Sequence, residues 1–181
     1  QAEMPWEVAM AGETNGLRGK KRYLFEGGIR VPGIFRWPEQ FETAVVDVPA
    51  TALDIMPTLT ELLGLGLPRD RVVDGESLAT LLTGRSVFER KQPLFWSIPT
   101  PDGLEYAVRQ GDWKLILDHA AVPVYLFDLK SDPYEITNLL GQQLETAAML
   151  QQSFDQIRTS VSQDMANWTH DEKANQDAQQ E

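Results

Sequence analysis

One basic segment of this chain has the residue types and spacing to bind an anion. Positions 17 to 36 hold six of the sixteen basic residues but only one acid, Glu26, in a chain of formal net charge −11. The basic residues are Arg18, Lys20, Lys21, Arg22, Arg30 and Arg36. Glycines at 16, 19, 27 and 28 allow turns that bring backbone N–H groups close to a ligand. Because fixed cations concentrate the field for a negative group, we predict an anion site here, with a solvated basic face as the alternative.

The rest of the sequence offers few groups for other chemistry. His119 follows Asp118 at a predicted strand end, where a loop could reach a substrate; an exposed loop histidine is the alternative. His170 lies in a polar tail and is expected to be inert. The absence of cysteine excludes disulfides, cysteine–zinc sites and cysteine nucleophiles. The aspartates lack the spacing of a calcium loop, and no nucleotide P-loop pattern occurs, so no metal ligand is predicted in this sequence.

Several short stretches together resemble one enzyme family. They read L-R-G-K-K at 17–21, F-E-G-G-I-R-V-P at 25–32, L-D-I-M-P-T-L at 53–59, D-G-E-S-L at 74–78, A-V-R-Q-G-D-W-K-L at 107–115, and L-F-D-L at 126–129, followed by D-P at 132–133, Glu135 and N-L at 138–139. Their order resembles the type I sulfatases, whose first pattern is L-R-G-G-K, three variable residues, an aromatic and E-G-G-[VI]-R-x-P. The second glycine of L-R-G-G-K is Lys20 here, so two adjacent lysines stand where the family usually has one.

The resemblance implies a role for one of these lysines. Lys21 aligns with the family lysine that contacts the sulfate group, and we predict that it is catalytic. Breaking the S–O bond of a sulfate ester shifts charge to the leaving oxygen, and a compact ammonium can stabilise that charge. Lys20 would be the ligand instead if the loop is shifted by one residue.

Two further residues are candidates for substrate binding, namely Arg18 and His119. Arg18 and Arg30 are also candidates for structural ion pairs, because a lone carboxylate such as Glu26 among cations is commonly a salt-bridge partner.

The resemblance also implies cofactors. A type I sulfatase uses a divalent metal, expected to be calcium, and a formylglycine made from a cysteine or serine in a C/S-x-P-x-R context. This sequence contains neither that motif nor, in residues 1–16, the family's Asp-Asn pair that helps hold the metal. We therefore expect both cofactors to lie outside this chain. The chain is expected to be the C-terminal portion of a longer sulfatase and to be inactive by itself.

The expected partner is a small-molecule or glycan sulfate ester. The acidic balance disfavours nucleic acid, and no apolar run approaches the roughly 20 residues that span a membrane. The resemblance implies a periplasmic, secreted or lysosomal location. Two alternatives remain open: a phosphoryl or phosphonate ester hydrolase of the alkaline-phosphatase superfamily, or a non-catalytic anion- or glycan-binding module. The upstream nucleophile would separate the two hydrolase classes.

The first half of the chain reads as loops with short elements that position the basic segment. The resemblance places residues 29–37 in a strand of a large central sheet, where Pro32 suits an edge, a strand start or a bulge. An exposed edge there would favour homo-oligomers. Residues 50–63 have helical apolar spacing, with Pro57 in the first turn and Gly64 as a stop. A second short helix is predicted at 77–82.

The second half favours an α+β fold, in which a long helix covers a small antiparallel sheet of about four strands. The strands are predicted at 94–98, 104–109, 113–117 and 122–129. A helix follows at 142–168, with its apolar stripe at Leu144, Ala147, Ala148, Leu150, Phe154, Ile157, Val161, Met165 and Trp168. We expect residues 1–90 to end an alkaline-phosphatase-like α/β domain, 91–168 to form the sheet-and-helix subdomain, and 169–181 to be a disordered tail.

Overall fold

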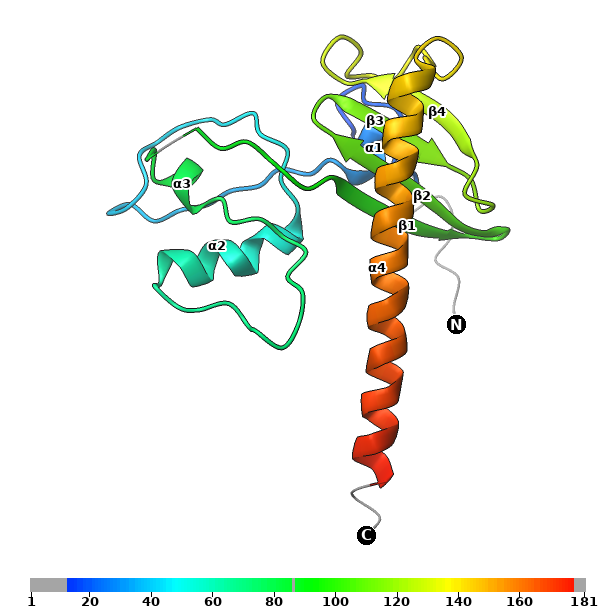
Figure 1. Cartoon of the computed structure of the whole chain (residues 1–181). Helices are drawn as coiled ribbons and strands as arrows, with labels where there is room; N and C mark the ends of the chain where they lie inside the picture. Colours follow the sequence, from blue (N-terminus) through cyan, green and yellow to red (C-terminus); the bar gives the residue numbers. More distant parts are fainter. Residues whose placement is uncertain (1–12, 86, 178–181) are drawn as a thin grey trace. The chain divides into compact units, whose positions relative to one another are not determined.

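The computed structural model describes residues 13–85 and 87–177. They divide into two compact units (Figure 1). Residues 13–29 and 95–177 belong to what we call the sheet unit, and residues 30–94 form the second unit. Within this chain the basic segment up to Ile29 therefore packs with the C-terminal sheet, although the predicted division at residue 90 grouped it with the catalytic domain. That division of the intact protein stays a prediction.

The sheet has four strands in the order β1-β2-β3-β4. They are β1 (Leu94–Thr100), β2 (Gly103–Gln110), β3 (Trp113–Leu117) and β4 (Pro123–Asp128). β3 pairs antiparallel with β2 on one side and with β4 on the other. A two-residue turn joins β2 to β3, and its Gly111 has a φ of 59°, a conformation that glycine adopts without a steric cost. The predicted antiparallel meander is confirmed.

The strand register gives the sheet two different faces. Val108, Leu115 and Leu126 are neighbours across β2, β3 and β4, and they form one buried cluster with Leu150 and Phe154 of α4 (Leu144–Asp177). The opposite face bears a second cluster, formed by Leu24, Ala107, Ile116, Phe127 and Leu129. The sheet therefore lies between α4 and the segment that contains α1 (Glu26–Ile29), as Figure 1 shows.

The helix α4 is longer than the stripe that anchors it. At 1.5 Å per residue, its 34 residues span about 51 Å, whereas four strands spaced about 4.8 Å apart cover roughly 15 Å. Ala147, Leu150, Phe154 and Ile157 pack on the sheet, but Val161 is 42% exposed. The predicted helix end at 168 and the predicted disorder of 169–177 are therefore corrected, because the structure continues α4 to Asp177. Residues 178–181, and the side chains of Met165, Trp168 and His170, lie outside the described residues.

The second unit contains the short 3-10 helix η2 (Ala52–Asp54), α2 (Ile55–Leu62) and α3 (Ala79–Leu82). Pro57 lies in the first turn of α2, and Gly64 follows its end with a φ of 67°, as predicted. The strand predicted at 29–37 does not form: Ile29 ends α1, and 30–37 have no regular structure. A strand needs a hydrogen-bonded neighbour, and no described strand pairs with this segment. Self-association through that edge stays a prediction.

Candidate functional site

A tight turn presents the two candidate lysines. The Tyr23 N–H donates to the Lys20 carbonyl at 2.9 Å, and Lys21 and Arg22 lie between these two residues. Arg22 has a φ of 80°, and Gly19 before the turn has a φ of 77°. Lys21 is exposed, whereas Lys20 is half-buried. The turn can therefore present Lys21 as a point charge to an anion.

The glycine pair that follows lets the turn pack directly on α1. The Gly27 N–H donates to the Arg18 carbonyl at 2.8 Å. A Cβ at Gly27 would lie 2.5 Å from the Gly19 carbonyl oxygen, and one at Gly28 would lie 2.1 Å from that of Tyr23. Only glycine fits at such distances, which explains why the E-G-G pattern accompanies the lysine turn. The turn and α1 thus form one closely packed piece.

A buried charge cluster anchors this piece to the sheet. Lys114 of β3 is fully buried, with its Nζ 2.9 Å from Glu26 Oε1 and 2.8 Å from Glu135 Oε1. Arg109, the cross-strand neighbour of Lys114 on β2, has its Nη1 3.8 Å from Glu26 Oε2. Because side chains alternate along strands, these cations lie on the face that carries α1. Glu26 therefore pairs with Lys114 and Arg109, not with Arg18 or Arg30 as predicted.

Glu135 is the second acid of this cluster and is fully buried. Its Oε2 accepts a hydrogen bond from the Glu26 N–H at 2.6 Å, and its backbone carbonyl accepts one from Arg18 Nη1 at 2.8 Å. Its Oε1 meets Lys114 as an ion pair without the geometry of a hydrogen bond. Burial raises the pKa of the Glu135 carboxyl above its usual range, while the Lys114 ammonium opposes that shift.

Arg18 is held inside the sheet unit. Besides its bond to Glu135, its guanidinium carbon lies 4.0 Å from the centre of the Phe25 ring and 5.1 Å from that of Tyr125. These cation–π contacts fix the side chain beside the turn. Its predicted contact with substrate stays a prediction. Arg30, the other predicted ion-pair partner, is exposed.

His119 is exposed in the loop between β3 and β4. The loop is closed by Asp118, whose Oδ1 accepts the N–H groups of Ala120 and Val122 at 2.9 Å each. His119 lies beside Gly103: a Cβ added at Gly103 would be 3.1 Å from the Cβ of His119. No hydrogen bond or ion pair recorded within 13–85 and 87–177 links His119 to the lysine turn. Its role in substrate binding stays a prediction.

In the second unit, the stretches 53–59 and 74–78 contact each other directly. The buried Asp54 carboxylate accepts the N–H groups of Thr51 and Glu76 at 2.8 Å and pairs with Arg90. A Cβ at Gly75 would lie 2.0 Å from the Leu53 carbonyl oxygen, so the two segments touch through their backbones. Both stretches therefore serve as packing within this unit.

The described part of the chain does not fit a metal centre or a membrane segment. Within it, no three His, Asp or Glu side chains group as metal ligands, and Lys114 lies between the two buried glutamates. None of its helices is long and apolar enough to cross a membrane.

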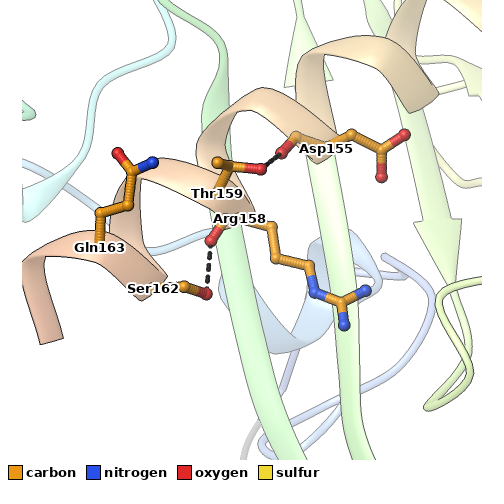
Figure 2. A pocket seen from close by; sticks show the side chains of 5 residues that line it. All are labelled: Asp155, Arg158, Thr159, Ser162 and Gln163. Atoms are coloured by element: carbon orange, nitrogen blue, oxygen red, sulfur yellow. Dashed lines mark hydrogen bonds between the residues drawn. The ribbon is translucent and has the colours of Figure 1, made fainter. Parts of the chain in front are cut away.

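A surface hollow on α4 is lined by residues of that helix alone (Figure 2). Two of them, Thr159 and Ser162, donate hydrogen bonds to carbonyls of α4 itself. The hollow contains none of the candidate site residues.

Comparisons with known proteins agree on one family. Residues 16–163 match the family model described as N-sulphoglucosamine sulphohydrolase, C-terminal. Arylsulfatase A of Bos taurus is 33% identical over 179 residues, covering 86% of this chain and 35% of the relative. Steryl-sulfatase of Homo sapiens is 44% identical over 86 residues, covering 44% of this chain and 15% of the relative. The chain thus spans about a third or less of these relatives.

Solved structures agree in fold. One, from work on the metabolism of multiple glycosaminoglycans by Bacteroides thetaiotaomicron, matches with a TM-score of 0.60 and 25% identity, covering 80% of this chain and 32% of that one. The crystal structure of Ps i-CgsB matches with a TM-score of 0.65 and 21% identity, covering 77% of this chain and 31% of that one. The α+β arrangement predicted for the end of an alkaline-phosphatase-like protein is confirmed.

Proposed function

Because this chain belongs to the sulfatase family, in which it matches the C-terminal part, we propose that the full-length protein hydrolyses sulfate esters. The observation that carries the proposal is the family match over residues 16–163, which begins at the lysine turn and includes every element anchoring it. The names of the relatives, arylsulfatase A and steryl-sulfatase, support the same class of reaction.

In this proposal the chain supplies a cation to the sulfate pocket. Lys21 is exposed at the turn and is aligned with the family lysine, so it is the residue that contacts the sulfate oxygens. It stabilises the negative charge that grows as the S–O bond breaks. The half-buried Lys20 is the alternative contact. Arg18 anchors the turn to the sheet unit through its hydrogen bond to the Glu135 carbonyl.

The remaining catalytic groups are assigned to the rest of the protein. Family membership implies a divalent metal, calcium in this proposal, and a formylglycine in the parent enzyme. The described residues contain no ligand cluster, and the sequence contains neither the C/S-x-P-x-R motif nor a cysteine. In this proposal both groups therefore belong to the rest of the full-length protein.

The proposed substrate is a small-molecule or glycan sulfate ester. The Bacteroides thetaiotaomicron structure supports the glycan class, and the steryl-sulfatase relative supports small molecules. A periplasmic, secreted or lysosomal location is proposed from the family resemblance alone.

The test compares an aryl sulfate with the corresponding aryl phosphate. Full-length protein, produced with a formylglycine-generating enzyme and supplied with calcium, is expected to hydrolyse the sulfate faster than the phosphate. The isolated 181-residue chain is expected to hydrolyse neither. A preference for the phosphate would support a phosphoryl hydrolase instead. If the full-length protein is inactive but binds glycans, a non-catalytic module would be supported. Turnover by the isolated chain would contradict the assignment of the metal and the formylglycine to the rest of the protein.

A further inference from the structure

We propose that Glu135 is a positioning residue that holds the lysine turn from both sides and thereby places Lys21 for the reaction. The proposal rests on the proposed function of Lys21. It assigns the C-terminal sheet a part in the chemistry, because Glu135 follows β4, the last strand of that sheet, and its recorded partners include Arg18, Glu26 and Lys114.

Two bonds from Glu135 bracket the turn. Its carbonyl accepts the Arg18 guanidinium at 2.8 Å, three positions before Lys21. Its carboxylate accepts the Glu26 N–H at 2.6 Å, five positions after Lys21. These partners lie 117 and 109 residues away in sequence, so the bonds are set by the fold and not by local chain geometry. One residue therefore fixes both ends of the segment that carries the lysine.

Glu135 is itself tightly held. Its φ of 57° lies in the left-handed region, which is unfavourable for a residue with a side chain. Such a conformation persists where surrounding contacts determine it. Here the Glu135 N–H donates to the Asp132 carbonyl at 3.2 Å, and the Asp132 carboxylate accepts the Thr137 N–H at 2.8 Å. The side chain therefore points in one defined direction, toward α1.

The charge balance ties Glu135 to the sheet. Lys114 lies between the two buried carboxylates, and Arg109 lies beside Glu26. Removing one charge from such a buried set leaves its partners uncompensated. Since the turn packs on α1 through the glycine pair, a shift of α1 would move the turn as well. A misplacement of about 1 Å can lower a rate by up to about 100-fold.

Glu135→Gln keeps the size of the side chain and an acceptor for the Glu26 N–H, but removes the charge that faces Lys114. The matched control is Glu145→Gln, at an exposed position in the first turn of α4. In the full-length protein we expect Glu135→Gln to lower kcat for an aryl sulfate about tenfold, with a smaller change in KM. The control should leave both constants unchanged.

A double-mutant cycle separates positioning from general stability. If Glu135 acts through Lys21, adding Glu135→Gln to Lys21→Ala should lower kcat by less than about twofold, because the group that it positions is already gone. An equal loss in both backgrounds would overturn the proposal, since it would mean that Glu135 supports the fold without acting through Lys21.

The rate of trypsin cleavage in the full-length protein measures how firmly the turn is held, without any assay of activity. Trypsin cuts after lysine and arginine, and the turn offers Lys20, Lys21 and Arg22. Under native conditions, Glu135→Gln should raise the cleavage rate at the turn about tenfold relative to the site at the exposed Lys130, through local opening. Unchanged relative cleavage would overturn the proposal. If Lys21→Ala leaves activity intact, the function proposed for Lys21 fails, whereas the cleavage result still decides whether Glu135 holds the turn.

Discussion

Replacing Lys21 with alanine in the full-length protein is expected to lower kcat/KM for an aryl sulfate by about two to three orders of magnitude. This is the loss typical of removing one preorganised group that stabilises transition-state charge. The decrease should appear mainly in kcat, because the charge on the leaving oxygen develops only as the bond breaks. The thermal stability of the protein should change little, since Lys21 is exposed at a turn and does not pack in the core. Steady-state kinetics and thermal unfolding of the same samples measure both effects.

Lys20→Ala is the matched control for this prediction. The structural role of Lys20 in the turn is carried by its backbone carbonyl, which alanine retains. The family places a glycine at this position, so its side chain is not required by the pattern. We expect only a small loss. If Lys20→Ala is the more damaging change, the alignment is off by one residue; if neither matters, the basic segment is a solvated face.

The largest effect on stability is expected at Lys114. Lys114→Met replaces the ammonium with an apolar side chain of similar length. It leaves Glu26 and Glu135 facing each other without their shared cation. Breaking a buried charge set in this way costs about 3–5 kcal/mol. Urea denaturation followed by circular dichroism should show this loss, whereas Lys130→Met, at an exposed position, should be nearly neutral. A loss below about 1 kcal/mol, the range of surface pairs, would contradict the buried cluster.

The pH dependence of Lys114→Met follows from the same groups. Burial already raises the pKa of Glu135, and Lys114 opposes the shift. Without Lys114, the pKa of Glu135 in the folded state should rise further above its value in the unfolded state. Glu26 would still face Arg109. A group with a raised folded pKa loses its stabilising contribution as pH rises through that value. The deficit of the variant should therefore be smaller near pH 5 than near pH 8.

The sheet and its covering helix could be predicted because their signals are local. Short β-prone runs separated by turn residues such as Gly111 define the meander, and the spacing of Leu150, Phe154 and Ile157 defines the covered face of α4. The end of α4 was missed because a polar helix can continue beyond the sheet without any apolar stripe. The strand predicted at 29–37 does not form, because a strand depends on hydrogen-bonded partners that a local sequence pattern does not reveal.

The anchoring of the site could not be predicted in the same way. The sequence indicated the lysine turn, but it suggested Arg18 or Arg30 as the partner of Glu26. Strand alternation places Lys114 and Ile116 on one face of β3. Nothing in the sequence shows that α1 covers this face, because that packing joins residues about 90 positions apart. Glu135 carried a weak signal, since it lies in the final family stretch.

A crystal structure of the full-length protein with bound inorganic sulfate tests the central claim most directly. We expect the Nζ of Lys21 to lie about 2.7–2.9 Å from a sulfate oxygen, as in other charge-assisted hydrogen bonds. The Glu135 bonds to Arg18 and to the Glu26 N–H should be unchanged. A sulfate bound in the active site by Lys20, or with neither lysine within hydrogen-bond distance, would contradict the account.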